Sequence, residues 1–106
     1  MAWSAITNIM SEILAPGAEA FSDELELSPD VTAHVRVETT DPTGLVVGVY
    51  SALEDGAWDV TPVIQYSMAG DSMSFVLRDI YIARLGLTSP GGATVTVSVR
   101  VYDRAA

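Results

Sequence analysis

Hydrophobic and polar residues alternate regularly towards the C-terminal end of the chain. In residues 93–102, valines occupy four alternate positions from Val95 to Val101, and threonine, serine and arginine fill the positions between them. Alternation of β-branched residues with a period of two is typical of a strand that buries one face. A strand of this length needs a second layer to cover its valine face. The pattern therefore predicts a layered β structure.

Similar apolar segments, separated by turns rich in Gly, Pro and Asp, recur through the rest of the chain. They predict strands over residues 18–27, 31–39, 45–53, 58–68, 73–77 and 80–83. Asp23 breaks the apolar face of the first segment and predicts a bend or a bulge there, and Gly86 is expected in the turns that lead into the last strand. Turn signals spaced in this way are typical of a sandwich or small barrel. The predicted fold is all-β, an antiparallel β-sandwich of jelly-roll or immunoglobulin-like type with about seven to eight strands.

Residues 1–15 allow two interpretations, a short amphipathic helix or an extended segment. Trp3, Ile6 and Met10 lie near helical spacing, whereas the β-branched Ile6, Thr7 and Ile9 suit an extended arm. Pro16 pushes the residue before it towards an extended conformation, so the extended interpretation is preferred. We expect residues 1–15 to form an N-terminal arm or first strand and residues 16–104 to form a single β-sandwich domain. An arm of this kind could be deleted, as residues 1–14, without unfolding the domain.

Composition narrows the classes of function. The 106 residues contain 14 acidic and 5 basic side chains, a net charge of −9, and no cysteine. This balance argues against binding to nucleic acid or to an anionic membrane surface, because both need clustered Lys and Arg. No apolar run approaches the length of a membrane span, and residues 1–15 lack the basic start of a secretory signal. We expect a protein that is made in the cytoplasm and not processed.

Candidate chemical groups are few. His34 is the only histidine, and the sequence offers it neither a nucleophile nor an orienting partner, so we expect no enzyme and no cofactor. Several predicted turns carry carboxylates, and calcium binds oxygen ligands of this kind. These residues are Asp41, Glu54, Asp55, Asp59 and Asp71. Because Asp is also common in turns for backbone reasons, solvated carboxylates are preferred and no metal is expected.

Aromatic residues provide the remaining candidates. A flat sugar-binding platform is one interpretation, with Trp58 beside a turn as its best member, but large aromatic residues are usually mostly buried. Trp3 differs because it lies near the chain terminus, where a bulky anchor suits docking against a neighbouring subunit. We therefore predict one protein contact at Trp3, Ile6 and Ile9, and a second at Tyr50 and Trp58.

A family resemblance covers nearly the whole chain. It rests on Leu-Ala-Pro-Gly at residues 14–17, Val-Tyr-Ser-Ala-Leu-Glu-Asp-Gly-Ala-Trp-Asp at 49–59, Phe-Val-Leu-Arg-Asp-Ile-Tyr-Ile-Ala-Arg-Leu-Gly at 75–86, and Thr-Val-Thr-Val-Ser-Val-Arg at 94–100. This order resembles small virion proteins of tailed bacteriophages. The resemblance implies a β-sandwich without catalytic residues, found in capsid decoration proteins, head fibres and tail components.

The leading expectation is a phage virion structural protein, a capsid decoration (cement) or head-fibre subunit that acts by non-covalent contacts. Its expected partners are the major capsid protein or other virion proteins, with homo-oligomers in the assembly, and its expected location is the virion. Two alternatives stay open. One is a tail adaptor or tail-tube component, and the other is a carbohydrate- or calcium-binding β module that uses Trp58 and the carboxylates near it.

Overall fold

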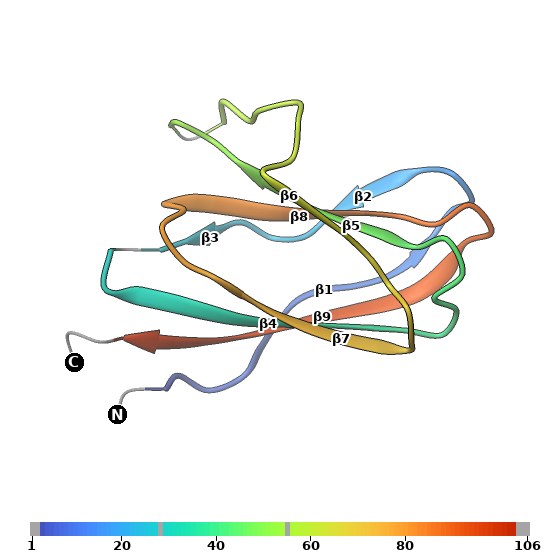
Figure 1. Ribbon diagram of the computed structural model, residues 1–106, viewed down its shortest axis with the longest axis horizontal. Helices are drawn as coiled ribbons and strands as arrows, with labels where there is room; N and C mark the ends of the chain where they lie inside the picture. Colours follow the sequence, from blue (N-terminus) through green and yellow to red (C-terminus); the bar gives the residue numbers. More distant parts are fainter. Residues whose placement is uncertain (1–2, 28, 55, 104–106) are drawn as a thin grey trace.

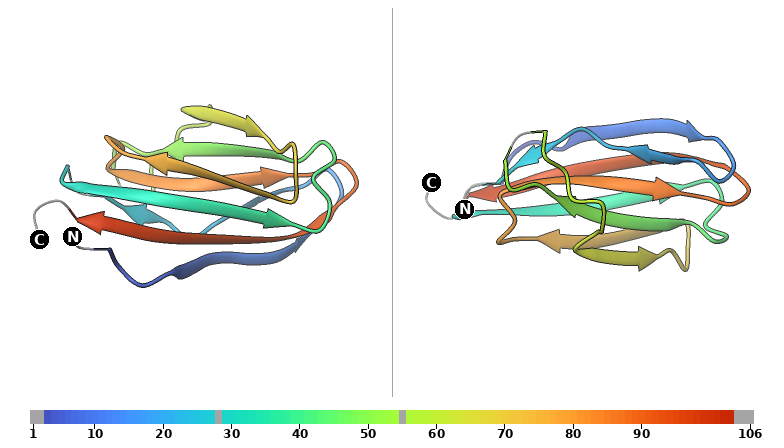
Figure 2. Two further views of the ribbon diagram at one scale, coloured as in Figure 1. Left: turned by 60° about the horizontal axis from the view of Figure 1, so that its bottom comes forward. Right: turned by 90° about the horizontal axis from the view of Figure 1, so that it is seen from above.

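The computed structural model describes residues 3–27, 29–54 and 56–103, and within them the chain forms two antiparallel sheets packed face to face (Figure 1). The first sheet has the order β1 (Thr7–Leu14), β9 (Ala93–Asp103), β4 (Val31–Thr39) and β7 (Ser72–Leu77). In the second sheet β2 (Glu19–Phe21) and β3 (Leu25–Glu26) lie beside β8 (Ile82–Thr88), followed by β5 (Val46–Ser51) and β6 (Ile64–Ser67). The strands of both sheets run in similar directions (Figure 2). The predicted all-β, sandwich-like architecture is confirmed.

The strands pair in a nested order. β1 pairs with β9, β2 and β3 pair with β8, β4 pairs with β7, and β5 pairs with β6. Two further pairings, β4 with β9 and β5 with β8, join these hairpin-like pairs into the two sheets. Sheets with aligned strands bury the side chains of their two inner faces, so the nested order also decides which residues meet in the core.

The core lies between the sheets and is built from the alternating positions. Val95, Val97 and Val99 of β9 are buried together with Val35 and Val37 of β4. The second sheet contributes buried residues from β5 and β8, namely Val47, Val49, Ala83, Leu85 and Leu87. Polar residues between these positions face outward, as the period of two requires. The prediction that the valine face of residues 93–102 is covered by a second layer is confirmed.

The N-terminal segment is an edge strand and not a projecting arm over the residues that the structure describes. β1 pairs with β9 from Thr7 to Leu14, which confirms the extended conformation over the helix. Between Asn8 and Met10 the register shifts in a β-bulge, and a bulge redirects side chains. Ile9 and Met10 are consequently both buried in the core. Deleting residues 1–14 would remove these core side chains, so we now expect the deletion to destabilise the domain and not to leave it intact.

Three local predictions meet different outcomes. The interruption that Asp23 predicts in the first segment is present, because β2 ends at Phe21 and β3 begins at Leu25. The segment 58–68 is strand only in β6, with an isolated bridge between Ala52 and Trp58 before it. Gly86 was expected in a turn and lies inside β8 opposite Gly48. Glycine suits this position because the ring of Tyr50 packs closely over it.

Candidate interaction surfaces

The first residues of the described chain, Trp3 and Ser4, continue the edge pairing with β9 beyond β1. The Ser4 amide donates to the Val101 carbonyl at 2.8 Å, and the Val101 amide donates to Ser4 Oγ at 2.9 Å. Trp3 forms a bridge to Tyr102, and their ring centroids are 5.0 Å apart. The guanidinium of Arg100 lies 5.5 Å from the Trp3 ring, within the range of a cation–π contact. Trp3 is therefore held on the sheet, with 40% of its surface exposed.

A shallow hollow of about 150 Å³ lies beside Trp3 on the outer face of the first sheet. We call it the basic hollow, and it is lined by Ile6, His34, Arg36, Ser98, Val99 and Arg100. The outward positions of β4 and β9 form it, because His34 lies opposite Arg100 and Arg36 opposite Ser98. Arg36 Nε lies 3.7 Å from Glu38 Oε1, and Arg100 Nε donates to the Ser4 carbonyl at 3.3 Å. The hollow therefore combines two guanidinium groups with the exposed side chain of Ile6.

The outer face of the second sheet carries a cluster around Arg84 of β8. Its guanidinium carbon lies 3.9 Å from the centroid of the Phe21 ring and 4.4 Å from that of Trp58. Two such contacts hold the cation between aromatic rings. Among the described residues no acceptor lies within hydrogen-bond distance of the buried Arg84 Nε. Trp58 is thus used within the chain, although it remains partly exposed.

Tyr50 covers the neighbouring part of this face. Its ring lies over Gly48 and Gly86, where a Cβ atom would come within 3.1 Å and 2.7 Å of Tyr50 Cε1. The Tyr50 hydroxyl donates to Glu19 Oε2 at 2.8 Å, and Phe21 contacts the ring edge-on, with centroids 5.7 Å apart. This hydrogen bond, followed by burial, raises the pKa of Tyr50 above its ordinary value. The ring therefore replaces the missing side chains of the two glycines.

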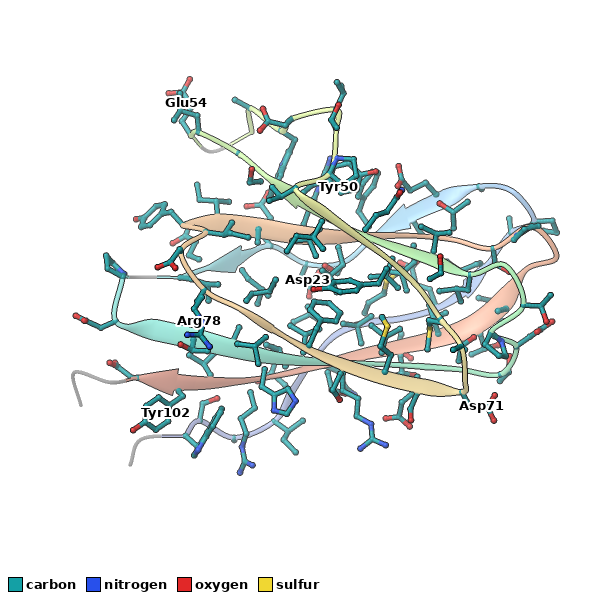
Figure 3. All side chains as sticks on the ribbon, viewed as in Figure 1. Asp23, Tyr50, Glu54, Asp71, Arg78 and Tyr102 are labelled. Carbon is teal, nitrogen blue, oxygen red and sulfur yellow. The ribbon has the colours of Figure 1, made fainter. Side chains whose placement is uncertain are left out.

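A protruding loop lies between β5 and β6, and its described residues, 52–54 and 56–63, extend beyond the outer face of the second sheet (Figure 1). Leu53 and Val60 are 96% and 95% exposed, which is unusual for side chains of this type. Glu54 and Asp59 are also exposed, and Figure 3 shows Glu54 at the outer end of the loop. A hollow of about 360 Å³ separates the base of this loop from the β7–β8 turn at Ile80 and Tyr81. The loop therefore presents apolar and acidic side chains together.

The structure separates the sequence-predicted contact residues into different environments. Ile6 lines the basic hollow on the outer face of the first sheet, and Trp3 lies beside this hollow. Tyr50 and Trp58 lie on the outer face of the second sheet. Tyr50 is the cross-strand neighbour of Arg84, and the Trp58 ring contacts the Arg84 guanidinium. Ile9 is only 6% exposed and belongs to the core, because the bulge in β1 turns it inward. The expectation that Ile9 is a surface anchor is corrected on that ground.

The acidic turn residues do not converge. In the described part of the chain, no three His, Asp or Glu side chains form a group that could hold a metal ion. Asp41 Oδ1 accepts the Thr43 amide at 3.0 Å, a turn interaction that lowers the pKa of Asp41. Asp55 lies outside the described residues. Within the same described ranges, no helix is long and apolar enough to cross a membrane.

Sequence reasoning did not identify the basic hollow or the cluster at Arg84. Alternation already placed Arg36 and Arg100 on outward faces, but the register that brings β4 and β9 together joins residues far apart in the sequence. For the cluster, the available signal was the pair of glycines in apolar strand segments, since glycine within a strand often marks close approach of another group. That signal was assigned to a turn at Gly86.

Comparison of the chain with protein-family models, with curated proteins and with solved structures finds no match. The strand order and the surface chemistry of the two sheets are therefore the basis for inferring a function.

Proposed function

We propose that this protein is a non-enzymatic structural protein of a phage virion, a capsid decoration or head-fibre subunit that acts through surface contacts. The observation that carries the proposal is the protruding loop, on which Leu53 and Val60 are almost fully exposed. Apolar groups exposed in this way suit burial in an assembly. The proposed partners are the major capsid protein or other virion proteins, together with further copies of this chain.

The strand order supports a jelly roll as the finer type of fold. If β2 and β3 are counted as two halves of one strand, the first strand pairs with the last, the second with the second last, and so on inward. Eight strands in two sheets make up a jelly roll, an architecture used by viral capsid and lectin domains. In an immunoglobulin-like sandwich the first two strands are neighbours, whereas β1 lies beside β9. This support for a virion role is an analogy at the level of fold.

Binding to particles assembled without this protein tests the proposal. The full chain is expected to co-sediment with such particles at a fixed stoichiometry, and Leu53→Ser with Val60→Ser is expected to weaken binding at least about tenfold. Ile13→Ser is the matched control, because Ile13 is also an exposed apolar residue but lies on β1. A wild-type chain that does not bind, or a loop variant that binds like wild type, would contradict the proposal.

A carbohydrate-binding β module is the second candidate, favoured by the partly exposed Trp58 in a fold that is also found in lectins. One face of Trp58 already contacts Arg84, which leaves less of the ring for stacking on a sugar. A glycan array compares the two functions directly. Glycan binding that Trp58→Ala removes would favour the module over the virion protein.

A further inference from the structure

Positive charge is scarce in this chain and is partly concentrated in the basic hollow. Two of the five arginines, Arg36 and Arg100, line it in a protein whose net charge is −9. The Arg36 side chain is 57% exposed despite its contact with Glu38. A guanidinium has five N–H donors, so one contact leaves donors with which each arginine can bind a carboxylate. The hollow is therefore suited to an acidic group.

The apolar part of the basic hollow narrows the kind of partner further. Ile6 borders the hollow, and its side chain is 68% exposed. A partner that matches both features must present an apolar side chain next to a carboxylate. An apolar core surrounded by charged groups is the usual arrangement of a specific protein contact.

The protruding loop has this combination of groups. Leu53 is followed directly by Glu54, and Asp59 directly by Val60, and all four side chains are exposed. The loop and the hollow lie on opposite sides of the molecule: Figure 3 shows Glu54 at the loop and Tyr102, which contacts Trp3, on the far side. One copy therefore cannot place its own loop in its own hollow.

We propose that the protruding loop of one copy binds in the basic hollow of a second copy, so that identical chains associate head to tail. Leu53 and Val60 pack against Ile6, while Glu54 and Asp59 face Arg36 and Arg100. This inference rests on the proposed assembly role and names the partner of the loop. A pair of bound copies leaves one loop and one hollow unoccupied, so the contact is heterologous and produces rings or filaments.

Charge also limits the ways in which two copies can meet. Chains that each carry a charge of −9 repel one another in most orientations. The loop-to-hollow orientation brings carboxylates to arginines, and complementary charge of this kind selects one orientation over others. Because every copy carries both surfaces, the loop and the hollow are always present at equal concentration.

Charge reversal in a mixing experiment tests the contact. Arg36→Glu with Arg100→Glu makes the hollow acidic, and Glu54→Arg with Asp59→Arg makes the loop basic. Sedimentation of the full chain is measured from about 1 µM to about 1 mM, the range of weak to moderate interfaces. Wild type is expected to associate, and each variant alone is expected to lose at least about tenfold in association constant. An equimolar mixture of the two variants is expected to regain association, because each basic surface then meets an acidic one.

A matched control for the loop variant separates a local effect from a change in net charge. Glu24→Arg with Asp71→Arg carries the same change in charge as the loop variant at exposed positions outside both surfaces, and it is expected to associate like wild type or more strongly. Circular dichroism verifies that each variant folds. If a charge reversal unfolds the chain, Leu53→Ser with Val60→Ser replaces it, since both side chains are almost fully exposed.

Three results would overturn the head-to-tail contact. They are a wild-type chain that stays monomeric over the whole range, a charge-reversal variant that associates like wild type, and a mixture that fails to regain association. Particle binding is measured separately from self-association. If it depends on the loop while the purified chain stays monomeric, the assembly role holds and the second copy is the wrong partner. If the chain associates but binds no particle, the proposed virion role fails and the contact stands.

Discussion

The outer face of the second sheet is covered by the chain's own side chains, whereas the outer face of the first sheet is open around the basic hollow. On the second sheet, the Tyr50 ring fills the space above Gly48 and Gly86, and Arg84 is held between Phe21 and Trp58. On the first sheet, Arg36 and Arg100 border a shallow hollow. Polar and charged groups that are shielded from solvent by such contacts contribute to folding. Groups that are positioned but remain exposed are the ones available to a partner.

The largest expected effect comes from disturbing the covered face. Gly86→Ala places a Cβ atom 2.7 Å from both Tyr50 Cε1 and Glu19 Oε2. The Glu19 side chain can move, but the Tyr50 ring is held by its hydrogen bond and by Phe21. We expect the free energy of unfolding to fall by about 1–3 kcal/mol, as for other overpacked sites, in a urea titration.

Gly70→Ala is the control for this substitution. A Cβ atom at Gly70 meets nothing within 4 Å, so we expect a change within about 0.5 kcal/mol or a small gain in stability. If Gly86→Ala lowers the free energy of unfolding no more than Gly70→Ala does, the outer face of the second sheet is packed less tightly than the distances indicate. The two outer faces would then not differ in their importance for folding.

Removing the Tyr50 hydroxyl tests how much the covered face depends on its hydrogen bond. Tyr50→Phe keeps the ring above the glycines and deletes the bond to Glu19, and we expect a loss of about 1 kcal/mol at neutral pH. The raised pKa of Tyr50 gives this loss a pH dependence. A group whose pKa is raised by folding stabilises the folded state below its unfolded pKa, and this contribution disappears as the pH rises through the folded value.

The difference in stability between wild type and Tyr50→Phe should therefore be constant from neutral pH to about pH 10 and shrink above it. Thermal unfolding at a series of pH values measures it. Tyr81→Phe is the control, because Tyr81 is 63% exposed and its removal should leave stability unchanged across the series. A constant gap between wild type and Tyr50→Phe at high pH would show that the bond to Glu19 does not stabilise the fold.

The smallest expected effect is on the open face. Arg36 and Glu38 are 57% and 53% exposed, and surface ion pairs of this kind contribute little to stability. We expect Arg36→Ala to change the free energy of unfolding by less than about 0.5 kcal/mol. A loss as large as that of Tyr50→Phe would mean that the open face is also needed for folding.

The sequence predicts the inner faces well and the outer faces poorly. The valines of residues 93–102 identify β9 and its buried side, because alternation is a local property of the chain. Arg36 and Arg100 come to the same hollow only because of the way in which β4 pairs with β9. That register joins residues more than sixty positions apart in the sequence, such as His34 and Arg100. No local pattern specifies such a pairing.

Two errors share a physical cause. Gly86 looks like a turn residue and Ile9 looks like part of a free arm, because each was judged from its neighbours in sequence. The ring of Tyr50 explains the first position, and a bulge in β1 explains the second. In both cases the deciding contact comes from another strand. The sequence also does not show that Trp58 contacts Arg84 and that Tyr50 donates to Glu19, because these partners too lie far away along the chain.

The nested strand order has a consequence for how this protein folds. The innermost pair, β5 with β6, joins nearby segments, whereas the outermost pair brings Thr7 to Val99 across almost the whole chain. The entropy of closing a loop must be overcome before such distant contacts add stability, and folds rich in them reach the native state in milliseconds to seconds. We expect the β5–β6 hairpin to form early and β1 to dock late. Until β1 docks, the edge of β9 that it covers is open to pairing with other chains.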